Sequence, residues 1–231
     1  YTTITPLCFE INKTISSMSN SYISVARVRV IFVFIALTLF SQHFFVETKT
    51  ESLLIFGDSI SAGYGMSKDK QWSEELKKIL DKEGIKLEVL NRSISGETTG
   101  GGLSRIKKTL DILRPDYLLI ELGGNDALRG YPPKKIHENL KEMILISKGF
   151  NVEVFLMQIR ILPNYGKRYQ TQFESIYKKV SNETNTALIP FMLQDVALDK
   201  NLMLQDGIHP NEKAQPLIAN FVYKSLKTYL E

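Results

Sequence analysis

The 231-residue chain has little of several residue types on which common kinds of protein site depend. Its one cysteine, Cys8, excludes an intramolecular disulfide and a multi-cysteine zinc site. The two histidines after residue 50, His137 and His209, are not spaced like a pair of zinc ligands. The sequence therefore predicts no metal site and no cofactor. Three aspartates remain as alternative ligands for a hard cation, although their spacing does not require one: Asp58, Asp126 and Asp206.

The chain also lacks a strong charge of either sign. Its formal net charge is +4 at pH 7, and residues 1–50, with four basic and two acidic side chains, carry half of that charge. The other 25 basic and 23 acidic residues leave residues 51–231 almost neutral. Because a nucleic-acid-binding domain concentrates basic side chains, the sequence excludes nucleic acid as a partner.

One apolar run stands out, and it is short. Val30–Phe40 contains no charged residue and follows Arg27 and Arg29. A basic segment followed by about ten apolar residues is typical of a secretory signal, whereas a membrane span needs about 20 such residues. Phe44–Val46 can lengthen the run into an uncleaved anchor. The alternative interpretation is a buried helix of the core.

From residue 51 onward, short apolar runs alternate with segments of helical periodicity. This alternation is typical of βαβ units, in which helices cover both faces of a parallel sheet. The sequence therefore predicts an α/β fold, a three-layer α/β/α sandwich around a five-stranded parallel sheet. The expected strands are 53–56, 86–90, 117–122, 152–158 and 187–190. The expected helices are 72–82, 103–113, 136–148, 170–183 and 212–230.

Polar segments follow every expected strand, and in a sheet of this kind ligands bind beyond the carboxyl ends of the strands. Residues 57–59 follow the first strand, 91–100 the second and 123–126 the third. Residues 160–166 follow the fourth strand, and 206–209 come after the fifth. We therefore expect the side chains capable of chemistry to share one edge of the sheet.

Ser59 is the candidate nucleophile, because a nucleophile elbow needs a strand that leads into a turn. Ser61 is the competing hydroxyl, and a simple turn or helix cap is the alternative role for this segment. His209 is the candidate base, since Pro210 disfavours a helical backbone there, whereas His137 is expected to be exposed on a helix. Asp206 can accept from the His209 ring or can serve only to shape the turn.

Two further segments offer hydrogen-bond donors to a developing oxyanion. Asn125 follows two glycines that allow close backbone approach, and its amide is a neutral donor; stabilising a turn is its alternative role. The glycine-rich segment 95–102 lacks the Gly-Lys-Ser/Thr ending of a phosphate-binding loop. A backbone N–H at Gly96 directed at an oxyanion fits this segment better.

In their order along the chain, these segments resemble the SGNH/GDSL hydrolase family. The matching motifs are GDSISAGYG at 57–65, SGET at 95–98, ELGGND at 121–126, MQIR at 157–160 and DGIHP at 206–210. The resemblance implies a flavodoxin-like architecture and a catalytic triad of Ser59, Asp206 and His209. It also implies an oxyanion hole formed by Ser59, Gly96 and Asn125, and the hydrolysis of acyl esters, acyl thioesters and lysophospholipids through an acyl-enzyme.

Apolar residues near these motifs are candidates for an acyl-binding groove. Leu128 and Tyr131 are expected in a mobile flap, and Ile161, Leu162 and Tyr165 in the opposite wall; ordinary surface loops are the alternative. Two other functions stay open, a carbohydrate O-acetyl esterase and a non-catalytic acyl- or lipid-binding envelope protein. A monomer is favoured, with contact to a membrane surface or N-terminal anchoring as further possibilities.

The N-terminal pattern predicts export. We expect residues 1–50 to form an extension that carries the secretory signal or signal-anchor, and residues 51–231 to form the hydrolase domain. The protein would then be periplasmic or secreted, or anchored in the inner membrane if the signal is not cleaved.

N-terminal sequencing of protein recovered from the cell envelope should show cleavage after the apolar run or an intact anchor. An intact chain confined to the cytosol would contradict export.

Overall fold

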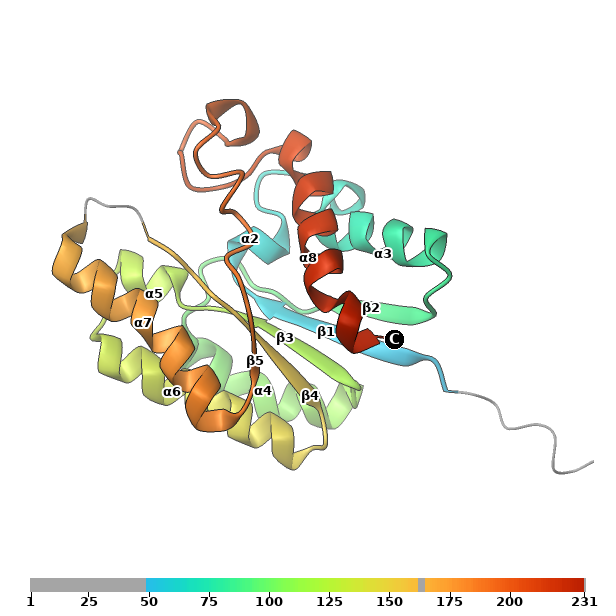
Figure 1. Ribbon diagram of the computed structural model, residues 1–231, viewed down its shortest axis with the longest axis horizontal. Helices are drawn as coiled ribbons and strands as arrows, with labels where there is room; N and C mark the ends of the chain where they lie inside the picture. Colours follow the sequence, from blue (N-terminus) through green and yellow to red (C-terminus); the bar gives the residue numbers. More distant parts are fainter. Residues whose placement is uncertain (1–48, 162–164, 231) are drawn as a thin grey trace, which may run out of the picture. The chain divides into compact units, whose positions relative to one another are not determined.

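A five-stranded parallel sheet organises the computed structural model, which describes residues 49–161 and 165–230 (Figure 1). The strand order is β2-β1-β3-β4-β5, and each strand lies within two residues of its predicted limits. The predicted α/β class and sheet are therefore confirmed, and this order is that of the flavodoxin-like folds. The strands are β1 (Glu51–Gly57), β2 (Leu87–Asn91), β3 (Tyr117–Glu121), β4 (Glu153–Met157) and β5 (Ala187–Ile189).

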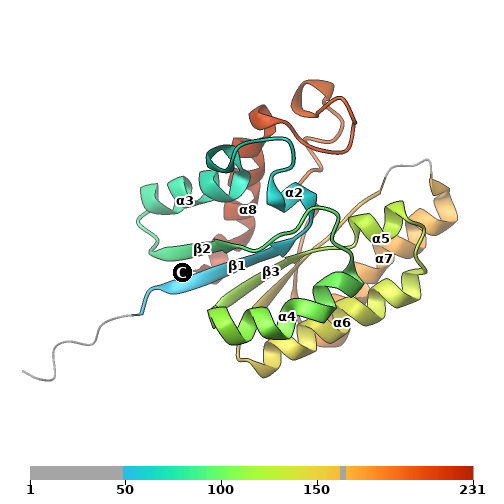
Figure 2. The same ribbon diagram turned by 180° about the vertical axis from the view of Figure 1, so that it is seen from behind.

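Helices cover both faces of the sheet, as the continuous apolar run in the central strand β1 requires. Leu53, Leu54, Ile55 and Phe56 have no exposed surface, although successive side chains point to opposite faces. Figures 1 and 2 show α3 (Trp72–Lys82) and α8 (Gln215–Leu230) on one face of the sheet. On the other face lie α4 (Thr99–Leu113), α6 (Pro133–Gly149) and α7 (Lys167–Thr184).

The helix limits differ from the prediction mainly at their first turns. Helix α4 begins at Thr99, four residues before the predicted start at residue 103, because the Thr98 hydroxyl accepts a hydrogen bond from the amide of Gly101 (3.2 Å). The glycine run predicted as loop thus forms the first turn of a helix. Gly102 lies so close to Leu122 that a larger residue would not fit.

The remaining helices also start where local chemistry favours it. Helix α6 begins with Pro133, whose fixed φ suits the first helical position. Helix α7 begins at Lys167, three residues before its predicted start, and a 3₁₀ turn, η4 (Glu212–Ala214), leads into α8. The other short helices are α2 (Ser59–Ala62), α5 (Gly124–Leu128), η1 (Lys68–Lys70) and η3 (Lys200–Leu202).

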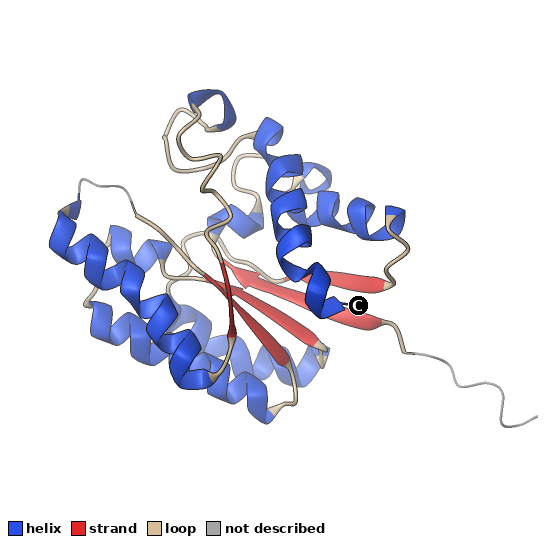
Figure 3. Ribbon diagram, in the orientation of Figure 1, coloured by secondary structure: helices blue, strands red, loops and turns tan. Residues whose placement is uncertain are grey.

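The short helices α2 and α5 begin just beyond the ends of β1 and β3, which pair with each other at the centre of the sheet. In this strand order, the neighbours β1 and β3 form the topological switch point, where ligands bind in doubly wound folds. Figure 3 shows long loops at the same edge of the sheet. The fold therefore provides a binding crevice next to Ser59 and Asn125.

Gln215 connects the C-terminal helix to this edge. It is fully buried at the start of α8, and its side-chain Oε1 accepts from the backbone amide of Trp72, the first residue of α3 (2.9 Å). Its side-chain amide donates to the carbonyl of Asn211 (3.1 Å). Because Asn211 lies two residues after His209, Gln215 fixes the loop that carries this histidine against the body of the domain.

The residues before the sheet lie largely outside this description. The chain divides into two units, Tyr1–Lys49 and Thr50–Glu231, and of the first unit the structure describes Lys49 alone. The apolar run at 30–40 and the extension expected over 1–50 therefore stay predictions, since residues 1–48 lie outside the described ranges. Within the part of the chain that the structure describes, no helix is long and apolar enough to cross a membrane.

Candidate active site

Three side chains from two distant segments form a hydrogen-bonded chain at the carboxyl edge of the sheet. The Ser59 Oγ lies 2.9 Å from Nε2 of His209. The Nδ1 of the same ring lies 2.7 Å from Oδ2 of Asp206. Ser59 and His209 are 150 residues apart in the sequence. The structure therefore brings together the serine, histidine and aspartate that the sequence analysis selected.

The backbone around Ser59 separates it from the competing hydroxyl of Ser61. Asp58 caps α2, since its Oδ1 accepts from the amide of Ile60 (3.1 Å), and Ser59 is thus the first residue of a helix. The Ser61 hydroxyl is buried and donates to the Glu121 carboxyl (2.8 Å). Of these two serines, Ser59 is therefore the one within hydrogen-bond reach of His209.

Asp206 both shapes the turn and contacts the ring, so the two roles considered for it coexist. Its Oδ1 accepts from the amides of Ile208 (2.9 Å) and His209 (3.0 Å), while Oδ2 faces the ring. Partial burial raises the pKa of Asp206, but these hydrogen bonds outweigh it and lower the pKa to about 2. The carboxylate is therefore ionised at neutral pH and holds the ring with Nδ1 protonated, which leaves Nε2 free to accept the Ser59 proton.

Tyr64 supports the histidine from one side, a contact that the sequence analysis did not identify. Its ring stacks on the His209 ring with centroids 4.3 Å apart and planes inclined by 29°. The one available signal was an aromatic residue between two glycines in the serine motif. His137 is partly buried instead of exposed as expected, because its ring lies 3.2 Å from the Glu183 carboxylate on α7.

Potential oxyanion donors surround Ser59. Gly96 is the third residue of a turn closed by the hydrogen bond from the Glu97 amide to Ile94, and its φ of +80° favours glycine there. The amides of Ser59 and Gly96 have no backbone acceptor within the described ranges. Two residues before Asn125 lies Gly123, whose φ is +122° and where any side chain would collide with the Tyr177 hydroxyl.

A buried carboxyl orients the Asn125 side chain. One N–H of its amide donates to Oδ2 of Asp58 (3.1 Å), and the amide's other N–H remains available to a ligand. Asp58 is only 3 % exposed, and this burial raises its pKa to about 6 despite the hydrogen bonds from Ile60 and Asn125. Its neighbour Glu121 is fully enclosed, and burial raises the pKa of Glu121 well above its usual range. Burial therefore favours the neutral form of the Glu121 carboxyl, for which the sequence analysis proposed no role.

A cavity of about 530 Å³ opens over these groups. Ser59, Gly96, Asn125 and His209 line its polar end. The other walls are mostly apolar and come largely from the segment between β5 and His209, which the sequence analysis did not assign to the site. The apolar lining comprises Ile60, Tyr64, Leu128, Ile159, Ile161, Phe191, Met192, Leu193, Ala197, Leu198, Met203 and Ile208.

The predicted acyl groove therefore differs in its composition from this cavity. Leu128 and Ile161 line it, whereas Tyr131 and Tyr165 do not. The carbonyl of Tyr131 accepts a hydrogen bond from the Tyr169 hydroxyl (2.7 Å), which ties this residue to α7. The expected flap is in part the regular helix α5, which includes Leu128. Leu162 lies outside the described residues.

The aspartates considered as cation ligands are engaged elsewhere. Asp126 accepts from the amide (2.8 Å) and the hydroxyl (2.6 Å) of Thr99, while Asp58 and Asp206 accept the bonds given above. Across residues 49–161 and 165–230, no group of three or more potential ligand residues is arranged to hold a metal ion. Another hollow, of about 590 Å³, lies at the amino ends of the strands, and none of the predicted site residues lines it.

Several known proteins are similar to this chain in sequence and fold. Residues 55–216 match the model of the GDSL-like lipase/acylhydrolase family. An arylesterase from Vibrio mimicus is 45 % identical over 196 residues, which cover 85 % of this chain and 98 % of the relative. Thioesterase 1/protease 1/lysophospholipase L1 of Escherichia coli K12 is 43 % identical over 183 residues, which cover 79 % and 86 % of the two chains.

A solved structure agrees with these sequence matches. The psychrotrophic esterase EstA from a Pseudoalteromonas species, in a form inhibited by monoethylphosphonate, superposes with a TM-score of 0.76 at 43 % identity. The match covers 78 % of this chain and 98 % of EstA. Because the family model spans most of the chain and includes both Ser59 and His209, the protein belongs to the GDSL-like lipase/acylhydrolase family.

Proposed function

We propose that the protein is a serine esterase and thioesterase that hydrolyses acyl esters, acyl thioesters and lysophospholipids through an acyl-enzyme. The observation that carries the proposal is the hydrogen-bonded chain from Ser59 through His209 to Asp206 beside an apolar cavity. The names of its relatives, which include an arylesterase and a thioesterase/lysophospholipase, support the same reaction class.

In the first step, Ser59 Oγ attacks the substrate carbonyl carbon while Nε2 of His209 takes the hydroxyl proton. The separation of 2.9 Å between these atoms suits direct proton transfer. Asp206, ionised because its pKa is about 2, stabilises the imidazolium that forms and keeps Nδ1 protonated. Tyr64, stacked on the ring, limits its rotation away from the serine.

Three hydrogen-bond donors stabilise the negative charge that develops on the carbonyl oxygen. They are the free amides of Ser59 and Gly96 and the second N–H of the Asn125 side chain. Preorganised donors of this kind each stabilise the transition state by ~3 kcal/mol. The Asp58 carboxylate, which accepts the first N–H of Asn125, holds the amide in position.

His209 then returns its proton to the leaving alcohol or thiol, and the carbonyl carbon remains bonded to Ser59 Oγ. Water attacks this ester with His209 as the base, and release of the acid restores the serine hydroxyl. Both halves of the reaction use the same groups.

The walls of the cavity favour a substrate whose acyl group carries a hydrocarbon chain. Phe191, Leu193 and Ile161 present apolar surface that would bind a hydrocarbon chain, whereas a sugar would find few hydrogen-bond partners there. The carbohydrate esterase is therefore not favoured. Export, based on the basic and apolar pattern of residues 27–40, would place this activity on lipids outside the cytoplasm.

The nucleophile can be tested by covalent labelling. An alkyl p-nitrophenyl phosphonate should label one residue, Ser59, and Ser59→Ala should abolish labelling and lower kcat for p-nitrophenyl butyrate by roughly 10⁴-fold or more. Ser61→Ala is the matched control, since this hydroxyl faces Glu121, and it should still be labelled. Labelling at another serine, or substantial activity in Ser59→Ala, would overturn the mechanism.

The role of Asp58 predicts opposite effects on stability and activity. Because its folded-state pKa of about 6 exceeds its ordinary value of 3.8, the native state binds an extra proton between these pH values, and its stability falls as pH rises through them. Asp58→Asn removes this cost, so the free energy of unfolding in urea should rise by roughly 1–3 kcal/mol at pH 8, with the gain vanishing near pH 4.

The same Asp58→Asn variant should lose activity, since Asn125 then faces an amide instead of a carboxylate. We expect kcat to fall about tenfold with little change in KM. Asp195→Asn, at an exposed aspartate, is the control and should alter neither quantity. An unchanged kcat in Asp58→Asn would refute the positioning role.

The cavity lining predicts which residue sets the chain-length preference. Leu128→Ala should reduce kcat/KM for p-nitrophenyl octanoate by about fivefold relative to the acetate, because an apolar contact to the chain is lost. Tyr131→Ala should leave the ratio of the two substrates unchanged, since Tyr131 lies outside the cavity. Equal effects of the two substitutions would contradict this assignment.

A further inference from the structure

Exposed apolar side chains surround the mouth of the catalytic cavity. Leu198 is 91 % exposed, and Tyr64, Leu128 and Ile208 are each at least 38 % exposed, although all four also line the cavity. Ile94, 49 % exposed, lies in the loop after β2, where its amide donates to the carbonyl of Gly57. We call these five residues the apolar rim.

The rim is a feature of this edge rather than of the whole surface. Besides Tyr131 in the loop after α5, the other strongly exposed large apolar side chains of the described ranges are dispersed over helices: Ile112, Leu145, Leu217 and Tyr229. The rim residues instead come from five separate loops or short helices at the carboxyl edge of the sheet. Exposed apolar groups gathered in this way mark an interaction site.

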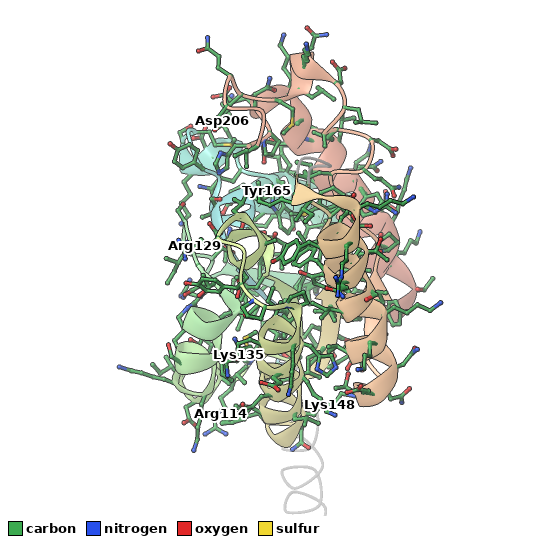
Figure 4. All side chains as sticks on the ribbon, turned by 90° about the vertical axis from the view of Figure 1, so that its left-hand side faces the viewer. Arg114, Arg129, Lys135, Lys148, Tyr165 and Asp206 are labelled. Atoms are coloured by element: carbon green, nitrogen blue, oxygen red, sulfur yellow. The ribbon has the colours of Figure 1, made fainter. Side chains whose placement is uncertain are left out.

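Cationic side chains accompany the rim. Arg160 is exposed and lines the cavity, and Arg129, also exposed, donates to the carbonyl of Gly96 (3.2 Å). Figure 4 shows Asp206 toward one end of the domain, Arg114 and Lys148 toward the other, and Arg129 between them. Asp199, the acid next to Leu198, directs its carboxylate at the amide of Asn201 (2.8 Å). The apolar rim is thus flanked by guanidinium groups that suit phosphate.

We propose that the apolar rim docks the enzyme onto a phospholipid surface, with Leu198 entering the acyl layer and Arg129 and Arg160 meeting the phosphates. The proposal rests on the proposed lipid-hydrolase function. The opening lies inside the rim, so a protein seated there would close the cavity, whereas a lipid layer supplies an acyl chain through it. Apolar insertion combined with cationic contact to phosphate is the usual basis of interfacial binding.

Local fluorescence separates this docking from any anchoring by the N-terminal segment. In full-length protein carrying Ser59→Ala and Cys8→Ser, a Leu198→Cys substitution provides one site for an environment-sensitive nitrobenzoxadiazole label. With vesicles of phosphatidylethanolamine and phosphatidylglycerol, emission from residue 198 should shift to the blue and rise at least about twofold. The label on Leu145→Cys, at an exposed leucine of α6, is the matched control and should not respond.

Each alternative outcome overturns the proposal. Equal responses at residues 198 and 145, or none at either, would mean that the rim does not enter the lipid. A response at residue 198 that grows with protein concentration without vesicles would identify a second copy of the chain as the occupant. A response to an added acidic carrier protein, but not to vesicles, would identify a protein partner.

Activity distinguishes failure of docking from failure of the proposed function. In the active protein, Leu198→Asp should lower hydrolysis of lysophospholipid held in vesicles by at least about fivefold relative to hydrolysis of soluble p-nitrophenyl acetate. Leu145→Asp should leave both rates unchanged. If the unsubstituted protein hydrolyses neither substrate, the proposed function fails, while an unchanged ratio in Leu198→Asp rejects docking alone.

Discussion

The parallel hydrogen bonding of the five strands is the constraint on which the site depends. Parallel strands bring all their carboxyl ends to one edge, and burial of the sheet on both faces leaves that edge as the place where polar chemistry can gather. Because β1 and β3 are neighbours, the segment after β1 and the segment after β3 meet there. Ser59 and Asn125 are consequently placed together although neither is near the other in sequence.

The buried acids behind the serine show how this edge combines stability with reactivity. Asp58 caps α2 through one carboxylate oxygen and orients the Asn125 amide through the other. Holding a carboxylate there has an energetic cost, which the raised pKa of Asp58 expresses. Burial likewise raises the pKa of Glu121, whose carboxyl accepts the hydrogen bond of the Ser61 hydroxyl. The energetic cost of the site is therefore electrostatic, and it arises from the burial of these two carboxyl groups next to Ser59.

Local sequence patterns predicted the sheet and the proposed reactive residues, because buried strands, turns and the residues after them leave short-range signals. Most contacts between distant segments left no such signal. The stacking of Tyr64 on His209 joins residues far apart in the chain, and the hydrogen bond from Asn125 to Asp58 spans 67 positions. The apolar wall at 191–198 was missed because turns interrupt it and give it no period. The early start of α4 depended on the cap formed by Thr98, which the glycine run concealed.

The position of His209 near the C-terminal end of the described domain has a consequence for the order in which the site forms during folding. Ser59 belongs to the first strand unit, but its partner arrives 150 residues later and is fixed only when Gln215 joins the last helix to α3. A chain still emerging from the ribosome, or held unfolded for passage across a membrane, has a serine without a base. On the proposed mechanism, hydrolytic activity therefore appears only at the end of folding, when the last helix is in place.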